Sequence, residues 1–370
     1  MQARAWIEVS VDAARANFLR IREAAGAAGV IPMVKADAYG LGAARVAGAL
    51  ESLEPRAYGV ATAEEGEALR MLGVERPILV FTPIPHGSIE AAAQAKLICC
   101  ASSLDTLDRW AAAAQRHGPL AFHVEIDTGM GRAGFDFRET GSWAHAVRAR
   151  VGPQLTWSGA YTHFHSADAN DGTATAAQWG RFRDAVAQLP VSSEDLLLHA
   201  SNSAAALRWP EYAADAVRPG IFLYGGHPAP GVKDVPAPAR VASVRARLVH
   251  VHDVPPGSTA GYGATHVARG WERWGTVAIG YGDGYPRALG NRGRVLVNGQ
   301  RVRVVGRISM DLTVVDISGV AGAAAGDIVT LIGRDGDEEI TVDEVATQAG
   351  TISYEILTGF TARLPRIGVA

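Results

Sequence analysis

Short apolar runs alternate with helix-like segments between Ile31 and Gly225. Many of the segments between the runs are rich in alanine and repeat their apolar residues at helical spacing. Strands that alternate with helices pair in parallel, and eight such repeats close a barrel, so the pattern predicts a (β/α)8 TIM barrel. A doubly wound parallel sheet is the alternative. The runs are IPMVKAD, AYGVAT, PILVFT, ICCASS, AFHVEID, SGAYTHF, LLLHASN and AVRPGIFLYG.

The pattern changes after the Pro- and Gly-rich stretch GGHPAPGVKDVPAPAR, which is typical of a linker. Alternating apolar and polar residues then predict a mostly β domain, and VNGQ predicts a hairpin because Asn-Gly supplies the positive φ angles of a tight turn. The segment VDEVATQAGTISYEILTG predicts a short helical end to this domain. We expect a barrel domain over residues 1–230 and a mostly β domain over 231–370, and the strand-like residues 1–10 can pair with either.

Composition argues against several classes of protein. The formal net charge of -3 leaves no basic surface for nucleic acid or an anionic membrane. Cys99 and Cys100 are adjacent in an apolar run, which indicates buried thiols in a reducing compartment rather than a disulfide. There is no metal-finger spacing among the histidines, no signal pattern and no apolar run of membrane-spanning length. We therefore expect a cytoplasmic protein without a metal.

Polar residues stand where the barrel strands should end, although inward positions of such strands are normally Val, Ile or Leu. One polar strand end could be a satisfied structural group. Five that converge at one barrel mouth indicate a site, because the C-terminal ends of parallel strands meet there. The residues are Lys35, Glu125 and Asp127 with Arg132 just beyond, His163 and His165, Asn202 and Ser203, and Arg218.

Lys35 follows the apolar IPMV and precedes ADAYGLG. A lone lysine at a strand end often only extends its amine to water. An apolar wall and cationic neighbours would instead lower its pKa and leave an amine that can attack a carbonyl. Ser203 and the amides of Gly220 and Ile221 could bind a phosphate nearby, since TIM barrels often hold one after their last two strands.

In the motif around Lys35 and in others along the chain, the sequence resembles the alanine racemases, which depend on pyridoxal 5'-phosphate (PLP). VKADAYGLG is similar to the cofactor-lysine motif of that family, and further motifs follow in the family's order along nearly the whole chain. One motif such as RPGI would be weak evidence, whereas the ordered set is specific. The others are DTGMGRAG, YTHFHSAD, HASNSAA, RPGIFLYG, GYGATH, GYGDGYPRALG, GRISMD and SYEILTG. The resemblance implies a barrel plus a β domain, in agreement with the patterns above.

The resemblance also implies an activity, a partner and site residues. The protein would interconvert L- and D-alanine for peptidoglycan metabolism, as a homodimer whose subunits share their active sites. Lys35 would bind PLP covalently and act as the base on one face, and Tyr262 of the other subunit would be the base on the opposite face. Residues expected around the cofactor are Tyr39, Arg132, His163, Asn202, Ser203, Arg218, Gly220, Ile221 and Tyr354. Residues expected around the substrate are Arg132, Met310, Asp311 and Tyr281.

These roles agree with the chemistry of racemisation. A proton must leave one face of the α-carbon and another must arrive on the opposite face, so two opposed bases are expected. Arg218 can only donate hydrogen bonds, so it would leave the pyridine nitrogen of the cofactor unprotonated and favour rapid reprotonation over side reactions. The pKa of Tyr262, about 10 when unperturbed, must be lowered by cations such as Arg132 and Lys35 before it can accept a proton.

Two positions depart from the family pattern. Glu125 stands where many relatives have a lysine modified to a carbamate that pairs with the arginine, so Glu125 is expected to point toward Arg132 as a permanent anion. Ser309 replaces a common cysteine, which should matter little to mechanism.

Three alternatives remain at this stage. A broad-specificity racemase would use the same machinery with a larger pocket, and such enzymes are often exported. A non-catalytic PLP-carrier protein would have the barrel but no β domain, and so neither Tyr262 nor Met310. A PLP decarboxylase of basic amino acids would place an acidic residue at the pyridine nitrogen, whereas this chain offers Arg218.

Overall fold

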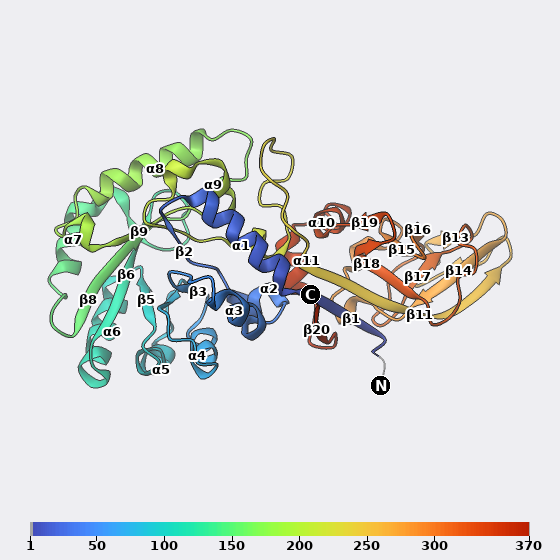
Figure 1. Cartoon of the computed structure of the whole chain (residues 1–370), viewed down its shortest axis with the longest axis horizontal. Helices are drawn as coiled ribbons and strands as arrows, with labels where there is room; N and C mark the ends of the chain where they lie inside the picture. The colour runs from blue at the N-terminus through green and yellow to red at the C-terminus, as the bar shows by residue number, and fades with distance from the viewer. Residues whose placement is uncertain (1–2, 370) are drawn as a thin grey trace.

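The computed structural model describes residues 3–369, which form two parts that lie side by side along the long axis of the molecule (Figure 1). In the first part, eight parallel strands follow the order β2-β10-β9-β8-β6-β5-β4-β3, and a parallel bridge between Met33 and Gly59 joins the two ends. The sheet therefore curls onto itself as a TIM-like barrel, as predicted, and the open doubly wound alternative is wrong. The strands are β2 (Gly29–Val30), β3 (Tyr58–Val60), β4 (Ile78–Val80), β5 (Ile98–Ala101), β6 (Leu120–Asp127), β8 (Leu155–Tyr161), β9 (Leu197–His199) and β10 (Ala216–Val217).

Helices surround this sheet, and several begin at a residue that caps their free backbone amides. Ser10 and Ser103 accept hydrogen bonds from the third residue of their helices, and Thr62 forms a reciprocal capping box with Glu65. The helices are α1 (Val11–Ala25), α2 (Lys35–Gly40), α3 (Ala43–Glu51), α4 (Ala63–Met71), α5 (Ile89–Gln94), α6 (Leu104–His117), α7 (Thr140–Arg148), α8 (Thr173–Val186) and α9 (Ser203–Arg208).

The two cysteines show how the barrel strands face two cores. Cys99 packs in the large core between sheet and helices, whereas Cys100 packs with Ile31, Leu79 and Tyr161 in a smaller cluster. Neighbouring residues of a strand point to opposite faces, so adjacent thiols cannot share one environment. Both thiols are free and buried, as predicted.

The second part is mostly β, as predicted. Its sheet has the order β19-β18-β15-β16-β17-β14-β11-β1-β20, and an added pairing of β18 with β11 closes a ring of strands. The predicted hairpin joins β15 to β16 with Val297 opposite Gln300, and Asn298 and Gly299 between them both have positive φ. The strands are β1 (Ala5–Ser10), β11 (Ala242–Val254), β14 (Glu272–Val277), β15 (Arg294–Val297), β16 (Gln300–Val304), β17 (Thr313–Asp316), β18 (Ile328–Asp335), β19 (Glu338–Ile340) and β20 (Arg366–Val369).

The first strand belongs to this second sheet, where β1 pairs antiparallel with β11 and parallel with β20. The chain therefore starts in the β part, crosses into the barrel and returns, so two crossings connect the parts. A short hairpin of β12 (Thr259–Ala260) and β13 (His266–Val267) projects beside the sheet. Two helices, α10 (Val342–Ala349) and α11 (Ser353–Gly359), lie between the sheet and the barrel (Figure 1).

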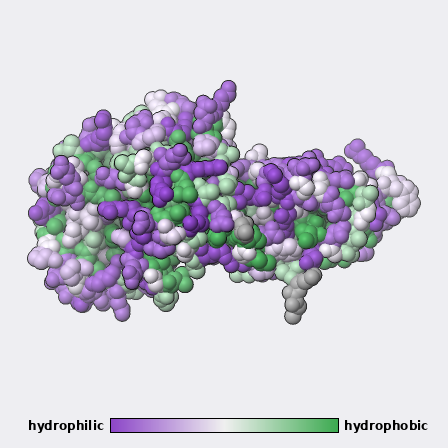
Figure 2. Space-filling model, viewed as in Figure 1, coloured by the Kyte–Doolittle hydropathy of each residue, from purple (hydrophilic) through white to green (hydrophobic). Residues whose placement is uncertain are grey.

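The surface is mixed in character. Figure 2 shows hydrophilic and hydrophobic residues interspersed over both parts on the visible face. Among residues 3–369, no helix has the length and apolarity needed to cross a membrane.

Candidate active site

Lys35 begins α2, two residues after Met33, which follows β2 and bridges to Gly59 of β3. The backbone beyond Lys35 is unusual. Ala36, Asp37, Ala38 and Tyr39 all have φ between 51° and 57°, so the chain makes a left-handed turn without a glycine. Glu65 holds this turn: its carboxylate accepts the Ala36 N–H at 2.7 Å and the Ala61 N–H at 2.8 Å. The lysine is thus placed by a strained turn that a carboxylate on α4 ties to the end of β3.

The environment of the Lys35 amine lowers its pKa. Burial is the largest cause, and the positive charges of Arg132 and Arg218 act in the same direction, while the Glu65 carboxylate opposes them. A larger share of neutral amine at physiological pH is what attack on a carbonyl requires. The expected apolar wall and cationic neighbours are therefore both present.

Arg218, only 4% exposed, is the centre of a buried hydrogen-bond network. Its guanidinium donates to the carbonyl oxygens of Thr162 at 2.8 Å and Ala200 at 3.0 Å, and to His199 Nδ1 at 2.8 Å. A further contact of 3.2 Å reaches His163 Nδ1. Burial lowers the pKa of Arg218 to about 10, which still leaves it charged at neutral pH.

The network extends to two histidines that sequence reasoning did not single out as site residues. His199 Nε2 lies 2.8 Å from His123 Nδ1. Because Arg218 can only donate, His199 accepts at Nδ1 and carries its proton on Nε2, which it donates to His123. Burial and the Arg218 charge lower the pKa of His123 to about 3 and that of His199 well below its usual value, so both rings are neutral. The sequence feature that could have pointed to them is a histidine within each of two predicted barrel strands.

Ser203, Gly220 and Tyr39 meet at the expected phosphate end of the site. The Ser203 hydroxyl accepts the Gly220 N–H at 2.8 Å. A Cβ on Gly220 would lie 2.1 Å from the Tyr39 hydroxyl oxygen, so only glycine leaves this cradle open. Tyr354, from α11 of the β part, places its ring 5.9 Å from that of Tyr39. Two domains of the same chain therefore contribute to one cradle.

Two connected cavities mark the mouth of the barrel. The inner one, of about 120 Å³, and the outer one, of about 490 Å³, share Lys35, Arg132, His163, Asn202 and Tyr354 in their walls. Asn202 also caps α9 by accepting the Ala205 N–H at 3.0 Å, so its side chain has a structural partner. The inner cavity is lined by Met33, Lys35, Tyr39, Phe81, Arg132, Tyr161, His163, Asn202, Ser203, Arg218, Gly220, Ile221 and Tyr354.

Glu125 differs from expectation. Its side chain is buried inside the barrel and only 4% exposed, but within residues 3–369 it makes no ion pair with Arg132, which is exposed in the loop after β6. Burial raises the pKa of Glu125, and the charges of Arg132 and Arg218 only partly oppose this. The carboxyl therefore lies near the cations without pairing directly with either.

The remaining predicted residues lie in the β part and away from Lys35. Tyr262 in the β12–β13 turn is 69% exposed, Met310 is 52% exposed and Tyr281 is 41% exposed. Tyr281 and Met310 are brought together, because the N–H groups of Tyr281 and Gly282 donate to the carbonyls of Ser309 and Met310 at 3.0 and 2.8 Å. Asp311 pairs with Arg363 at 2.6 Å. None of these four predicted residues lines either cavity beside Lys35.

The comparisons with known proteins agree along the whole chain. Residues 9–228 match the family model of the alanine racemase N-terminal domain, and residues 241–368 match that of the C-terminal domain. The chain is 36% identical to the alanine racemase of Nostoc sp. over 380 residues, covering 99% of this chain and 96% of that protein. It is 38% identical to the alanine racemase of Geobacillus stearothermophilus over 365 residues, covering 98% and 92%.

Solved structures give the same result. The alanine racemase of Streptomyces lavendulae superposes with a TM-score of 0.93 at 33% identity, covering 100% of this chain and 98% of that one. The alanine racemase of Bartonella henselae, whose structure has covalently bound pyridoxal phosphate, superposes with a TM-score of 0.90 at 30% identity, covering 100% of both chains.

Proposed function

Because the chain belongs to the alanine racemase family, we propose that it interconverts L- and D-alanine with Lys35 and Tyr262 as two opposed bases and with PLP as its cofactor. The observation that carries the proposal is the lowered pKa of the Lys35 amine in a cavity whose far end is an open cradle at Gly220. An amine, a phosphate cradle and a buried guanidinium in one cavity are the groups that a covalently bound pyridoxal phosphate needs.

The residues present fit PLP. Ser203, Tyr39, Tyr354 and the backbone at Gly220 and Ile221 would hold its phosphate, and Lys35 would hold its aldehyde carbon. When bound, PLP supplies the electron sink that makes the α-hydrogen of the amino acid acidic. Arg132 would contact the phenolic oxygen, with Asn202 nearby in the wall.

Arg218 would donate to the pyridine nitrogen. The neutral His199 and His123 behind it supply no proton at physiological pH, since burial and the Arg218 charge depress the pKa of both. The Arg218 guanidinium would therefore donate a hydrogen bond to the pyridine nitrogen without transferring a proton to it. His163, whose pKa is also lowered by burial and the same charge, would link Arg218 toward the second base.

We propose a homodimer as the active species. Tyr262 lines neither cavity beside Lys35 of its own chain, and the β part of that chain exposes Tyr262, Met310, Tyr281 and Asp311. A second copy could bring these residues over the cavity, where the backbone amide of Met310 would bind the substrate carboxylate beside Asp311 and Tyr281 would line the entrance. A cytoplasmic location, a role in peptidoglycan metabolism and a division of domains at residue 230 are part of the same proposal.

Reduction with borohydride tests the cofactor assignment, because it fixes PLP to the lysine that carries it. The chain has only three lysines, Lys35, Lys96 and Lys233, so peptide mapping has a clear answer. We expect the label on Lys35 alone, and a label on either other lysine would refute the assignment. A racemase assay over several L-amino acids then separates an alanine-specific enzyme from a broad-specificity one.

A further inference from the structure

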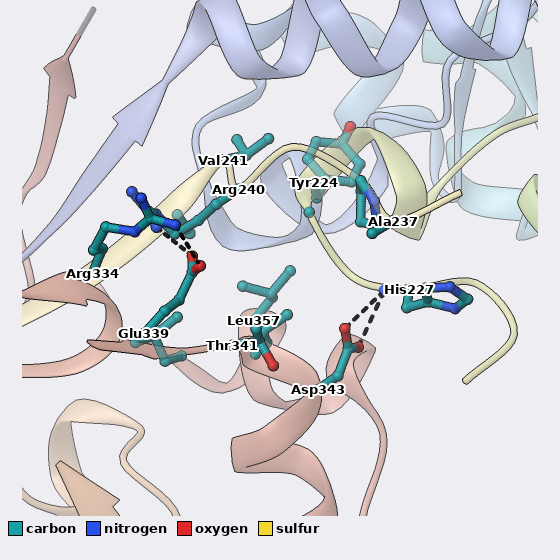
Figure 3. A pocket seen from close by; sticks show the side chains of 15 residues that line it. Tyr224, His227, Ala237, Arg240, Val241, Arg334, Glu339, Thr341, Asp343 and Leu357 are labelled. Atoms are coloured by element: carbon teal, nitrogen blue, oxygen red, sulfur yellow. Dashed lines mark hydrogen bonds and ion pairs between the residues drawn. The ribbon is translucent and has the colours of Figure 1, made fainter. Parts of the chain in front are cut away.

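Three segments meet at the Asp343 carboxylate, which lines the outer active-site cavity. Figure 3 shows one of these contacts, between Asp343 and His227. His227 lies in the linker after the barrel, Asp343 is in the first turn of α10, and Ser353 begins α11. The two Asp343 oxygens accept the His227 backbone N–H at 3.1 and 3.0 Å, and the Ser353 hydroxyl donates to the same carboxylate. One side chain therefore ties the linker to both helices of the β part.

These contacts are close to the phosphate end of the site on both sides. Tyr354 directly follows Ser353 and packs against Tyr39 in the cradle. His227 follows shortly after the turn at Gly220 and Ile221, whose amides are expected at the phosphate. A displacement of either segment would therefore change how Tyr354 sits relative to that turn.

The linker, the turn at Ile221 and the start of α11 are tightly packed against one another. A Cβ on Gly226 would lie 2.5 Å from Ile221 Cγ1 and 3.1 Å from Ser353 Cβ, so the linker, the phosphate turn and α11 are in direct contact. His227 and Asp343 also line both the outer active-site cavity and a neighbouring cavity of about 440 Å³ under the linker. The contact between His227 and Asp343 is thus part of the wall between these two cavities.

We propose that Asp343 is a positioning residue for the cofactor: it clamps His227 and Ser353 and so holds the Tyr354 hydroxyl at the phosphate end of the cavity. The proposal rests on the proposed function, since it takes PLP to be bound at Lys35. It assigns Asp343 no contact with cofactor or substrate.

The charge of Asp343 supports the same role. Burial, together with the carboxylates of Asp168 and Asp343, raises the pKa of Tyr354 to about 12. A tyrosine is already protonated at neutral pH, and this shift widens the pH range over which the Tyr354 hydroxyl can donate a hydrogen bond to a phosphate oxygen.

The test measures PLP affinity by titrating the full-length apoprotein with PLP and following absorbance and fluorescence. Asp343→Ala should weaken the affinity roughly tenfold, because both acceptors of the clamp are lost. Asp343→Asn keeps one acceptor oxygen and should lose less than about threefold. Asp337→Ala, which removes an exposed carboxylate in the turn between β18 and β19, should leave the affinity unchanged.

A double-mutant cycle with Tyr354→Phe separates positioning of the hydroxyl from a general structural effect. If Asp343 acts through that hydroxyl, Asp343→Ala should cost less than about twofold in the Tyr354→Phe background. Equal tenfold losses in both backgrounds, or unchanged affinity in Asp343→Ala, would overturn the proposal. If Asp343→Ala does not fold, Ser353→Ala takes its place in the cycle, with about a threefold loss expected beside Tyr354 and none beside phenylalanine.

Measuring PLP binding by the wild-type chain distinguishes failure of the proposed function from failure of the proposed role of Asp343. A wild-type chain that binds no PLP at Lys35 refutes the proposed function. Normal wild-type binding with additive effects in the cycle refutes only the role of Asp343.

Discussion

The predicted site residues of the barrel are mostly buried and hydrogen-bonded, whereas those of the β part are exposed. At the barrel mouth, Ser203 and Arg218 form hydrogen bonds within the same chain, and the turn after Lys35 is tied by Glu65. Tyr262 and Met310 are largely exposed and line neither of the two cavities beside Lys35. The barrel half of the candidate site is therefore preorganised within one chain, whereas the exposure of the β half motivates our proposal that a second copy completes the site.

Removal of the lysine tests the preorganised half and should have the largest effect. Lys35→Ala deletes both the attachment of the cofactor and one base, so racemisation should fall by at least about 10³-fold. The measurement is the rate of D-alanine formation together with the visible absorbance of the cofactor. Lys233→Ala, in the exposed linker, is the control and should keep both. Retention of substantial activity in Lys35→Ala would mean that the barrel does not supply the essential amine.

Removal of the tyrosine tests the exposed half. Tyr262→Phe deletes only a hydroxyl, so we expect a loss of about 10²–10³-fold in racemisation with PLP still bound. Exchange of the α-proton from L-alanine should suffer more than exchange from D-alanine, because only one face loses its base. Equal exchange from the two isomers would contradict the facial assignment.

Mixing two inactive variants tests whether the barrel half and the β half of one site come from different chains. Random reassociation of Lys35→Ala with Tyr262→Ala makes half of the dimers mixed, and one site in each mixed dimer has both bases. Activity should therefore return to about a quarter of the wild-type value if the site is shared between subunits. Absence of recovery, once exchange of subunits has been demonstrated, would mean that each chain completes its own site.

Glu125 should give the smallest effect, and here the structure changes the expectation. A direct ion pair with Arg132 would make Glu125→Gln costly, but no such pair is present among residues 3–369, so activity should stay within about threefold of wild type. A loss above about a hundredfold would restore the idea of an essential anion.

The stability of the Glu125 variant should depend on pH. The pKa of Glu125 is raised in the folded protein, so its folded state loses stability relative to the unfolded chain as pH rises through that pKa. Below the ordinary glutamate pKa this loss is absent. The melting temperature of Glu125→Gln should therefore exceed that of wild type by more at pH 8 than at pH 4, and thermal denaturation at the two values measures the gap. If the difference in melting temperature between the variant and wild type does not change with pH, the environment of Glu125 is more polar than its burial suggests.

Sequence patterns were sufficient for the fold and for the barrel half of the site. Eight apolar runs correspond to the eight barrel strands, and the predicted polar residues near their ends, other than Glu125 and Asp127, line one pair of cavities. This succeeds because the period of a strand and the common mouth of a barrel are properties of local sequence and of topology.

Other features could not be predicted, for identifiable reasons. The hydrogen bond between His199 and His123 joins strands that are not sequence neighbours, so no spacing reveals it. The distance between Glu125 and Arg132 depends on a loop conformation. In the proposed dimer, the position of Tyr262 relative to Lys35 depends on a surface between two chains, which a single chain does not contain.

The left-handed turn after Lys35 has a stereochemical consequence. Ala36 and Ala38 have φ of 51° and 53°, a conformation that costs an L-residue roughly 1–2 kcal/mol and that a D-residue prefers. A semisynthetic chain with D-alanine at position 36 should therefore adopt this turn with less strain than the natural chain. An enzyme that interconverts the two hands of its substrate therefore has, beside its proposed cofactor lysine, a stretch of backbone that suits D-residues better than the L-residues of which it is made.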